Sequence, residues 1–217
     1  MPVAFFDLDR TLISVNSGAL WVKSELRLGY LSRWQATRAA AWIFGYHLGF
    51  SKMEPILEEA VRTLAGSAEA DVRDRTLAFY RAEVAHTYRP GAREAVARHR
   101  AAGHTLAMLT SSSPYLSDPV REELGFDHVL CNRFEVESGL FTGRSAGPLC
   151  FGPGKLGYAE RLCAELGTAV GEATFYTDSA SDRAVLEAVA EPVCVNPDPT
   201  LRRMAHKRGW KVEDWGA

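Results

Sequence analysis

The sequence has little net charge of either sign. Its 25 Lys and Arg residues nearly balance 27 Asp and Glu residues, which gives a formal net charge of −2. It also contains no run of basic residues. Proteins that bind nucleic acids neutralise phosphodiester charge with clustered Lys and Arg side chains. We therefore expect no nucleic-acid partner.

Residues that bind soft metals are also sparse. The chain has four cysteines and six histidines, and none of them shows the paired spacing of a metal-binding motif. In a reducing compartment such cysteines are small buried hydrophobic residues. The start of the chain, Met1–Ala4, runs directly into an apolar stretch and leaves no room for a signal peptide, which predicts a cytoplasmic location.

Most of the sequence consists of short apolar stretches, typical of strands, that alternate with helical patterns. With 217 residues, of which 47% are hydrophobic, the chain can bury one core and a small accessory unit. The alternation predicts an α/β fold with a doubly wound, Rossmann-like parallel sheet. The predicted strands are Val3–Phe6, Thr105–Leu109, His128–Leu130, Ala173–Tyr176 and Val193–Val195. The predicted helices are Ala92–Ala102, Pro114–Leu124, Leu156–Leu166, Asp182–Ala188 and Thr200–Arg208, with a hairpin at Phe134–Thr142.

Two aspartates, Asp7 and Asp9, follow the first predicted strand. Residues i and i+2 of a strand share a side, so both carboxylates can face one reacting centre. Open α/β sheets bind ligands at the carboxyl ends of their strands. One aspartate would then act as a nucleophile and the other as an acid and base. The alternative is an acidic turn after a buried strand, because Asp is common in turns.

A second acidic pair, Asp178 and Asp182, follows the apolar stretch 173–176. If both pairs meet at one edge of the sheet, four carboxylates lie close together, which is unfavourable unless a cation is present. Hard oxygen ligands with few His or Cys residues indicate Mg²⁺. This combination predicts a phosphoryl-transfer site.

Two further segments could bind a phosphoryl group. Thr110 and Ser111 end a buried strand, where a hydroxyl and main-chain N–H groups can hold phosphoryl oxygens, although helix capping is an alternative. Lys155 follows two glycines at the start of a helix. It does not form a Walker P-loop, because that motif needs Gly at Leu149 and Ser or Thr at Leu156.

The order of these motifs, Asp-x-Asp-x-Thr, a strand ending in Thr, a lone Lys and Asp-x-x-x-Asp, resembles the haloacid dehalogenase superfamily of phosphohydrolases. The resemblance covers almost the whole chain. It implies that Asp7 forms an aspartyl-phosphate and that Asp9 protonates the leaving group and then activates water. Two positions depart from the family pattern, because Arg10 and Thr177 stand where Gly is usual. Neither is expected to contribute a side chain to the chemistry.

The resemblance also implies how a metal ion and a phosphoryl group are bound. Mg²⁺ would be held by the carboxylates of Asp7 and Asp178 and by the main-chain oxygen of Asp9, with Asp182 next to these ligands. The phosphoryl oxygens would be bound by Thr110, by Lys155, and by the main-chain N–H groups of Leu8 and Ser111.

Residues 13–88 break the strand pattern, because their apolar spacing is helical. A helical insertion at this place resembles the C1 cap of subfamily I, as in the phosphoserine-phosphatase-like branch. We therefore predict an α/β core at 1–12 and 89–217 and a cap at 13–88. Such a cap would close over the site and select the leaving group.

The resemblance leaves the substrate open. In phosphoserine phosphatases a Glu and an Arg of the cap hold the substrate, whereas here Asn16 takes the first position and either Glu58 or Arg62 lies near the second. We expect a small phosphomonoester, either phosphoserine or another alcohol or amino-alcohol phosphate. A phosphomutase and a catalytically weak binding protein of the same fold are the alternatives.

The most apolar segment of the insertion, residues 39–50, is too short to cross a bilayer, since it has about 12 residues and a span needs about 20. The favoured interpretation is a cap helix that is buried against its neighbours or against a second subunit in a homodimer. A wall for an apolar substrate comes next, and contact with a membrane surface is least expected.

Overall fold

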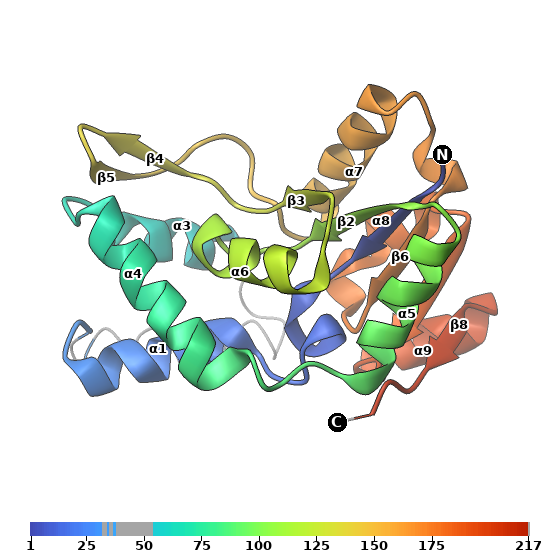
Figure 1. Ribbon diagram of the computed structural model, residues 1–217, viewed down its shortest axis with the longest axis horizontal. Coiled ribbons are helices and arrows are strands. Elements are labelled where there is room, and N and C mark those ends of the chain that lie inside the picture. The colour runs from blue at the N-terminus through green and yellow to red at the C-terminus, as the bar shows by residue number, and fades with distance from the viewer. Residues whose placement is uncertain (32–33, 35–36, 38–53, 217) are drawn as a thin grey trace.

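The computed structural model describes residues 1–31, 34, 37 and 54–216 (Figure 1). Six strands form one sheet in the order β3-β2-β1-β6-β7-β8, and every neighbouring pair is parallel. This arrangement confirms the predicted α/β fold. The strands are β1 (Val3–Phe6), β2 (Thr105–Leu109), β3 (His128–Leu130), β6 (Thr174–Thr177), β7 (Glu191–Val195) and β8 (Lys211–Glu213).

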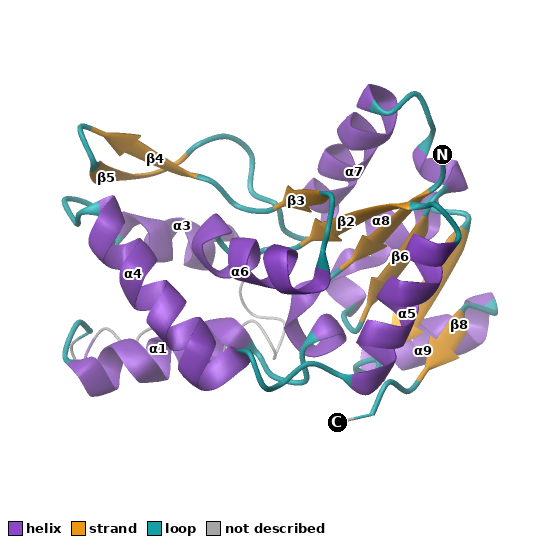
Figure 2. Ribbon diagram, in the orientation of Figure 1, coloured by secondary structure: helices purple, strands orange, loops and turns teal. Residues whose placement is uncertain are grey.

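Helices cover both faces of the sheet (Figure 2). Phe6 and its neighbours on one face pack against α5 (Pro90–Ala101) and α6 (Pro114–Leu124). Phe5 points to the other face and packs with residues of α7, α8 and α9. Because successive residues of a strand face opposite sides, strands covered on both faces are apolar throughout. These helices are α7 (Pro153–Glu165), α8 (Arg183–Ala188) and α9 (Pro199–Arg208).

The predicted strand and helix positions need small corrections. β6 is shifted by one residue relative to the prediction, and β7 begins two residues earlier. Helices α5, α7 and α9 begin at a proline, where the missing N–H costs nothing. Strand β8 was not predicted, because three residues with two charged side chains at a sheet edge carry no apolar pattern.

The predicted hairpin consists of β4 (Phe134–Glu137) and β5 (Leu140–Ser145). Its two turn residues, Ser138 and Gly139, have φ values of 51° and 79°, the left-handed conformation that tight hairpin turns require. The hairpin does not join the main sheet. Instead it lies on the insertion, where the Phe141 N–H donates to the Ser67 carbonyl at 3.0 Å.

The insertion between β1 and β2 lies to one side of the sheet (Figure 1). Its entry and exit are adjacent, because the Ser14 N–H donates to the Thr87 carbonyl at 2.8 Å and the Arg89 N–H donates to the Leu12 carbonyl at 3.0 Å. Its described helices are α1 (Ser17–Leu28), α3 (Glu54–Arg62) and α4 (Glu69–Phe79). Short π- or 3₁₀-helical turns are found at Tyr80–Val84, Val170–Glu172 and Ala180–Asp182, whereas Leu8–Leu12 is a tight turn in which Asp9 and Arg10 have non-helical backbone angles.

The apolar segment 39–50 lies outside the described residues, so its predicted packing is untested. Within 1–31, 34, 37 and 54–216, no helix is long and apolar enough to cross a membrane.

Candidate active site

Loops from three adjacent parallel strands bring the predicted residues to the same edge of the sheet. Asp7 follows β1, Thr110 follows β2 and Asp178 follows β6. The Asp7 N–H donates to the Tyr176 carbonyl at 2.9 Å, which continues the pairing of β1 and β6 up to the aspartate. The side chains at this edge are buried, with exposed fractions of 7% for Asp7 and Asp178, 1% for Thr110 and Asp182, and 3% for Lys155.

Lys155 lies between two of the four carboxylates. Its Nζ is 2.8 Å from Asp7 Oδ1 and 2.8 Å from Asp182 Oδ2. Burial lowers the pKa of Lys155, but the attraction of Asp182 and Asp7 outweighs burial and raises the pKa above its ordinary value. The ammonium group is therefore charged at neutral pH and holds the loops after β1 and β6 together.

Asp182 has one satisfied oxygen and one orphaned oxygen. The Thr177 hydroxyl donates to Asp182 Oδ2 at 2.7 Å, so the side chain at this unusual position supports the acidic cluster, a role that we did not expect from the sequence. Asp182 Oδ1 is buried and has no hydrogen-bond partner in the part of the chain that the structure describes. An unpartnered carboxylate oxygen is costly to bury, and it marks this cluster as a place for a further cation or donor.

The carboxylates of Asp7, Asp178 and Asp182 repel one another. Burial raises the pKa of Asp178 to about 8, and the charges of Asp7 and Asp182 add to this effect. Burial likewise raises the pKa of Asp7, against the opposing attraction of Lys155. A divalent cation would relieve this repulsion, and carboxylate oxygens are ligands that Mg²⁺ prefers. The residues present therefore fit the predicted ion.

The predicted ligand set has only two carboxylates, with a main-chain oxygen as the third ligand. Within the part of the chain that the structure describes, no group of three or more His, Cys, Asp and Glu side chains is arranged to hold a metal ion. A set of two carboxylates and a carbonyl does not require such a group.

The loop after β2 provides hydrogen-bond donors. The Thr110 N–H donates to the Leu130 carbonyl at 2.9 Å, and the Ser112 N–H donates to Thr110 Oγ1 at 3.1 Å. The Thr110 hydroxyl donates to no acceptor in the described part of the chain, so its proton can be donated to a ligand. Among the described residues, the main-chain N–H groups of Leu8 and Ser111 also donate to no protein acceptor. A main-chain N–H can bind a phosphoryl oxygen only if no protein acceptor takes its hydrogen bond, and both predicted donors meet this condition.

Comparison with known proteins agrees with this geometry. The sequence matches the haloacid dehalogenase-like hydrolases over residues 4–187. The chain belongs to the haloacid dehalogenase-like hydrolase family. It is 30% identical to a probable phosphatase of Mycobacterium tuberculosis, over 96% of this chain and 74% of that protein. It is 27% identical to a histidinol-phosphatase of Neisseria meningitidis, over 97% of each chain.

Solved structures show the same fold. A protein of unknown function from Bordetella pertussis is 30% identical and superimposes with a TM-score of 0.90 over 99% of each chain. A phosphoserine phosphatase that carries an analogue of the phospho-aspartyl intermediate has a TM-score of 0.70 at 18% identity, over 97% of this chain and 91% of the other. The family match and the relatives named as phosphatases confirm the predicted resemblance to the phosphatases of the family, and with it the prediction of an enzyme.

The predicted acid and base of this hydrolase, Asp9, is fixed by the insertion. Its Oδ1 accepts a hydrogen bond of 2.6 Å from the N–H of Ser17, the first residue of α1. Burial raises the pKa of Asp9, and the bond from Ser17 opposes the shift. Asn16, the predicted specificity residue, caps the same helix, because its Oδ1 accepts from the Ala19 N–H at 2.8 Å. The Asn16 carboxamide oxygen is therefore already used in a hydrogen bond within the protein.

The other two predicted specificity residues do not join the acidic cluster. Glu58 and Arg62 lie on α3 and are exposed, and Arg62 Nη1 pairs with Glu59 Oε2 at 2.7 Å. Among the described residues, neither side chain contacts Asp7 or Lys155. Their role in substrate binding stays a prediction.

The first departure from the family pattern keeps the geometry of glycine. Arg10 has a φ of 57°, in the left-handed region that glycine adopts most easily. Its carbonyl accepts a hydrogen bond of 3.1 Å from Arg89 Nε, and the same guanidinium also donates to the Gly216 carbonyl. Arg89 was not predicted as a site residue, because its sequence neighbours Pro90 and Gly91 indicate only a return to the core.

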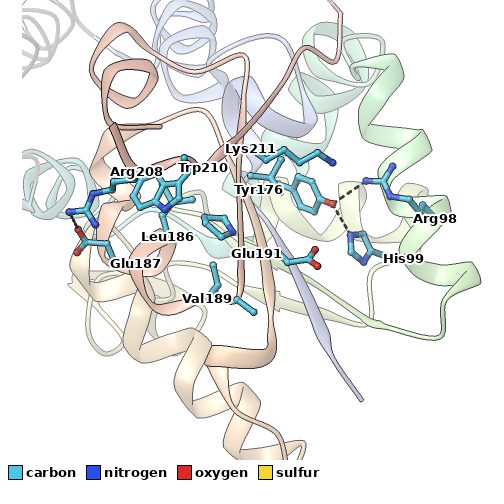
Figure 3. A pocket seen from close by; sticks show the side chains of 14 residues that line it. Arg98, His99, Tyr176, Leu186, Glu187, Val189, Glu191, Arg208, Trp210 and Lys211 are labelled. Atoms are coloured by element: carbon cyan, nitrogen blue, oxygen red, sulfur yellow. Dashed lines mark hydrogen bonds and ion pairs between the residues drawn. The ribbon is translucent and has the colours of Figure 1, made fainter. Parts of the chain in front are cut away.

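A separate cavity of about 630 Å³ lies where β7 and β8 begin, and none of the predicted catalytic residues lines it (Figure 3). Several of its polar groups contact one another. Arg208 contacts Glu187, while the Tyr176 hydroxyl lies 2.8 Å from His99 Nε2 and accepts from Arg98 Nη2 at 3.1 Å. Arg98 and Glu191 form no ion pair among the described residues, and these contacts by themselves identify no ligand for the cavity.

The buried histidine of this cavity predicts how stability depends on pH. Burial lowers the pKa of His99 to about 4, and the charges of His104 and Arg98 add to this effect. Because the folded-state pKa lies below the unfolded value, the stabilisation is present above pH 6.5 and is lost as the pH falls towards 4. Relative to His99→Gln, the wild-type free energy of unfolding should fall by roughly 1–3 kcal/mol over this window.

Urea unfolding at a series of pH values measures this difference. His206→Gln, an exchange of an exposed histidine, is the matched control and should keep the wild-type dependence. Parallel curves for the wild type and His99→Gln would show that the pKa of His99 is not lowered in the folded protein.

Proposed function

We propose that this hydrolase cleaves phosphomonoesters of small metabolites in two steps, through an aspartyl-phosphate on Asp7. The observation that carries the proposal is the contact of Lys155 Nζ with Asp7 Oδ1 and Asp182 Oδ2, both at 2.8 Å, at the ligand-binding edge of the sheet. A fixed cation beside the nucleophile offsets the charge of an approaching phosphoryl group. The relatives named as phosphatases support the same chemistry.

In the first step, the Asp7 carboxylate attacks phosphorus and the bond from phosphorus to the substrate alkoxide breaks. Asp9 donates its proton to the leaving oxygen. The raised pKa of Asp9 favours the protonated form that this step needs. In the second step, Asp9 accepts a proton from the water that attacks the phosphoryl group, and Asp7 is regenerated.

The hydrogen bond from Ser17 leaves Asp9 Oδ2 for this proton transfer, because Oδ1 is already engaged. Since Ser17 opens α1, the orientation of the acid depends on the position of the insertion. We propose that residues 13–88 act as the cap and residues 1–12 and 89–217 as the core. The cap then aligns the acid when it closes over a substrate.

The phosphoryl oxygens would be bound by Thr110 and Lys155 and by the main-chain N–H groups of Leu8 and Ser111. Asp7, Asp178 and the main-chain oxygen of Asp9 would hold Mg²⁺. Bound there, the ion supplies positive charge that screens the phosphoryl oxygens from the attacking carboxylate. Asp182 supports this site indirectly, because it orients Lys155 and lies beside Asp178.

The substrate class follows from what the cap residues offer. Asn16 has no charge, and its oxygen caps α1, so it offers no strong partner for an ammonium group. One relative is named a histidinol-phosphatase, and another, from Mycobacterium tuberculosis and 28% identical, a phosphoserine phosphatase. We propose an alcohol or amino-alcohol phosphate, with Glu58 and Arg62 as the further candidates for contact with its non-reacting end.

Asp7→Asn should lower the rate of phosphate release from p-nitrophenyl phosphate by at least about 10³-fold, because an amide is a poor nucleophile. The shape of the side chain is nearly unchanged, so circular dichroism should show a folded protein. Asp74→Asn, at an exposed aspartate of the insertion, is the control and should keep full activity. Turnover within about tenfold of the wild type would exclude Asp7 as the nucleophile.

Removal of Mg²⁺ with a chelator should abolish turnover, and Asp178→Asn should weaken Mg²⁺ binding at least about tenfold, because a charged oxygen ligand is lost. Isothermal titration calorimetry on the metal-free protein measures the affinity, again with Asp74→Asn as the control. If the Asp178 variant binds Mg²⁺ as tightly as the wild type, Asp178 is not a ligand.

Asn16→Glu should raise kcat/KM for L-phosphoserine relative to glycerol phosphate, since the added charge can pair with the substrate ammonium group. Asn16→Gln is the matched control, because it loses the helix cap to a similar extent but adds no charge. Competition between the two substrates measures the ratio. A wild-type preference for phosphoserine of about a hundredfold would show that Asn16 does not limit its binding.

A further inference from the structure

The loop that follows β2 is held by a residue of the neighbouring strand end. Asn132 comes two residues after β3 and is 4% exposed. Its side-chain Nδ2 donates to the Ser111 carbonyl at 2.6 Å, and its main-chain N–H donates to the Ser112 carbonyl at 3.0 Å. Asn132 therefore binds two successive carbonyl groups of this loop.

These contacts fix the orientation of one peptide group. In a trans peptide the carbonyl and the N–H point in opposite directions. In the peptide between Ser111 and Ser112, the carbonyl accepts from Asn132 and the N–H donates to Thr110 Oγ1. With both ends bound, this peptide cannot rotate. The preceding N–H, that of Ser111, is the group with no acceptor among the described residues.

The same carboxamide reaches the segment that leads to Lys155. Asn132 Oδ1 accepts from the Cys150 N–H at 2.7 Å, and Cys150 is fully buried. Helix α7 begins three residues later and carries Lys155 in its first turn. An amide suits this position because it offers a donor and an acceptor together, whereas a carboxylate offers only acceptors.

We propose that Asn132 is a positioning residue for phosphoryl transfer. It directs the Ser111 N–H at the phosphoryl group and fixes the distance between this donor and the segment that carries Lys155. The inference rests on the proposed function, because it assumes that a phosphoryl group occupies the edge of the sheet. Donors aligned in advance stabilise the transition state most, so their loss lowers kcat more than it raises KM.

Asn132→Asp tests the inference, because it removes the donor to Ser111 and keeps the acceptor for Cys150. We expect kcat to fall about 10²-fold and KM to change by less than about threefold. Asn196→Asp is the matched control. Asn196 also follows a strand, donates from Nδ2 to Asp214 at 2.6 Å and accepts from the Trp215 N–H at 3.0 Å. That control should lose similar stability in urea and keep the wild-type kcat.

The pH profile gives a second readout that a purely structural role would not change. When the introduced carboxyl group is protonated, its O–H can again donate to the Ser111 carbonyl. The kcat of Asn132→Asp, measured per folded protein and divided by the wild-type value, should therefore rise as the pH falls. Asn132→Ser removes the amide without adding a titrating group, and it should show the loss of kcat without this recovery.

Four outcomes contradict the inference. They are an unchanged kcat in both Asn132 variants, a loss no larger than that of Asn196→Asp, a pH profile parallel to that of the wild type for Asn132→Asp, and failure of both Asn132 variants to fold. Absence of turnover by the wild type would instead contradict the proposed function, and the inference with it. A wild type that is active beside fully active Asn132 variants would contradict the inference alone.

Discussion

The buried ammonium group of Lys155 is the contact on which the candidate site depends. Without it, Asp7 and Asp182 would face each other unscreened in a place that excludes water, where charges interact strongly. The turn before Lys155 allows the ammonium group to lie between these two carboxylates. A Cβ atom at Gly154 would lie 2.3 Å from the Leu149 carbonyl oxygen, so only glycine lets the chain enter α7 at this point. The sequence pattern of glycine before lysine therefore has a steric cause.

Much of this arrangement could be predicted from the sequence, for reasons that are local. Asp7, Thr110 and Asp178 each end an apolar strand, and parallel strands bring their carboxyl ends to one edge. The prediction therefore needed only the strand positions and not the contacts between them. Lys155 was predicted differently, because its place after two glycines at the start of a helix matches the lone Lys of the family pattern. Such patterns survive shifts of one or two residues in the predicted boundaries.

The rest depends on contacts between distant segments, which no local pattern records. Arg89 binds the Arg10 carbonyl across 79 residues, and Asn132 binds Ser111 across 21. The hairpin was predicted from its own alternation, but its docking on the insertion at Ser67 was not. The cap residues were the weakest prediction, because Glu58 and Arg62 were placed by alignment to a pattern and lie on an exposed face of α3.

A site with this much buried negative charge would relax if its loops could move. Asp182 Oδ1 has no partner among the described residues, and the pKa of Asp178 is raised to about 8, so small shifts that bring water or backbone donors to these carboxyl groups would stabilise the folded protein. Arg89 holds the loop after β1 and Asn132 holds the loop after β2, whereas Lys155 holds the loop after β6 through Asp182. In the proposed site, a cation held by Asp7 and Asp178 would offset the repulsion among these carboxylates, so that binding, rather than folding, would stabilise the cluster.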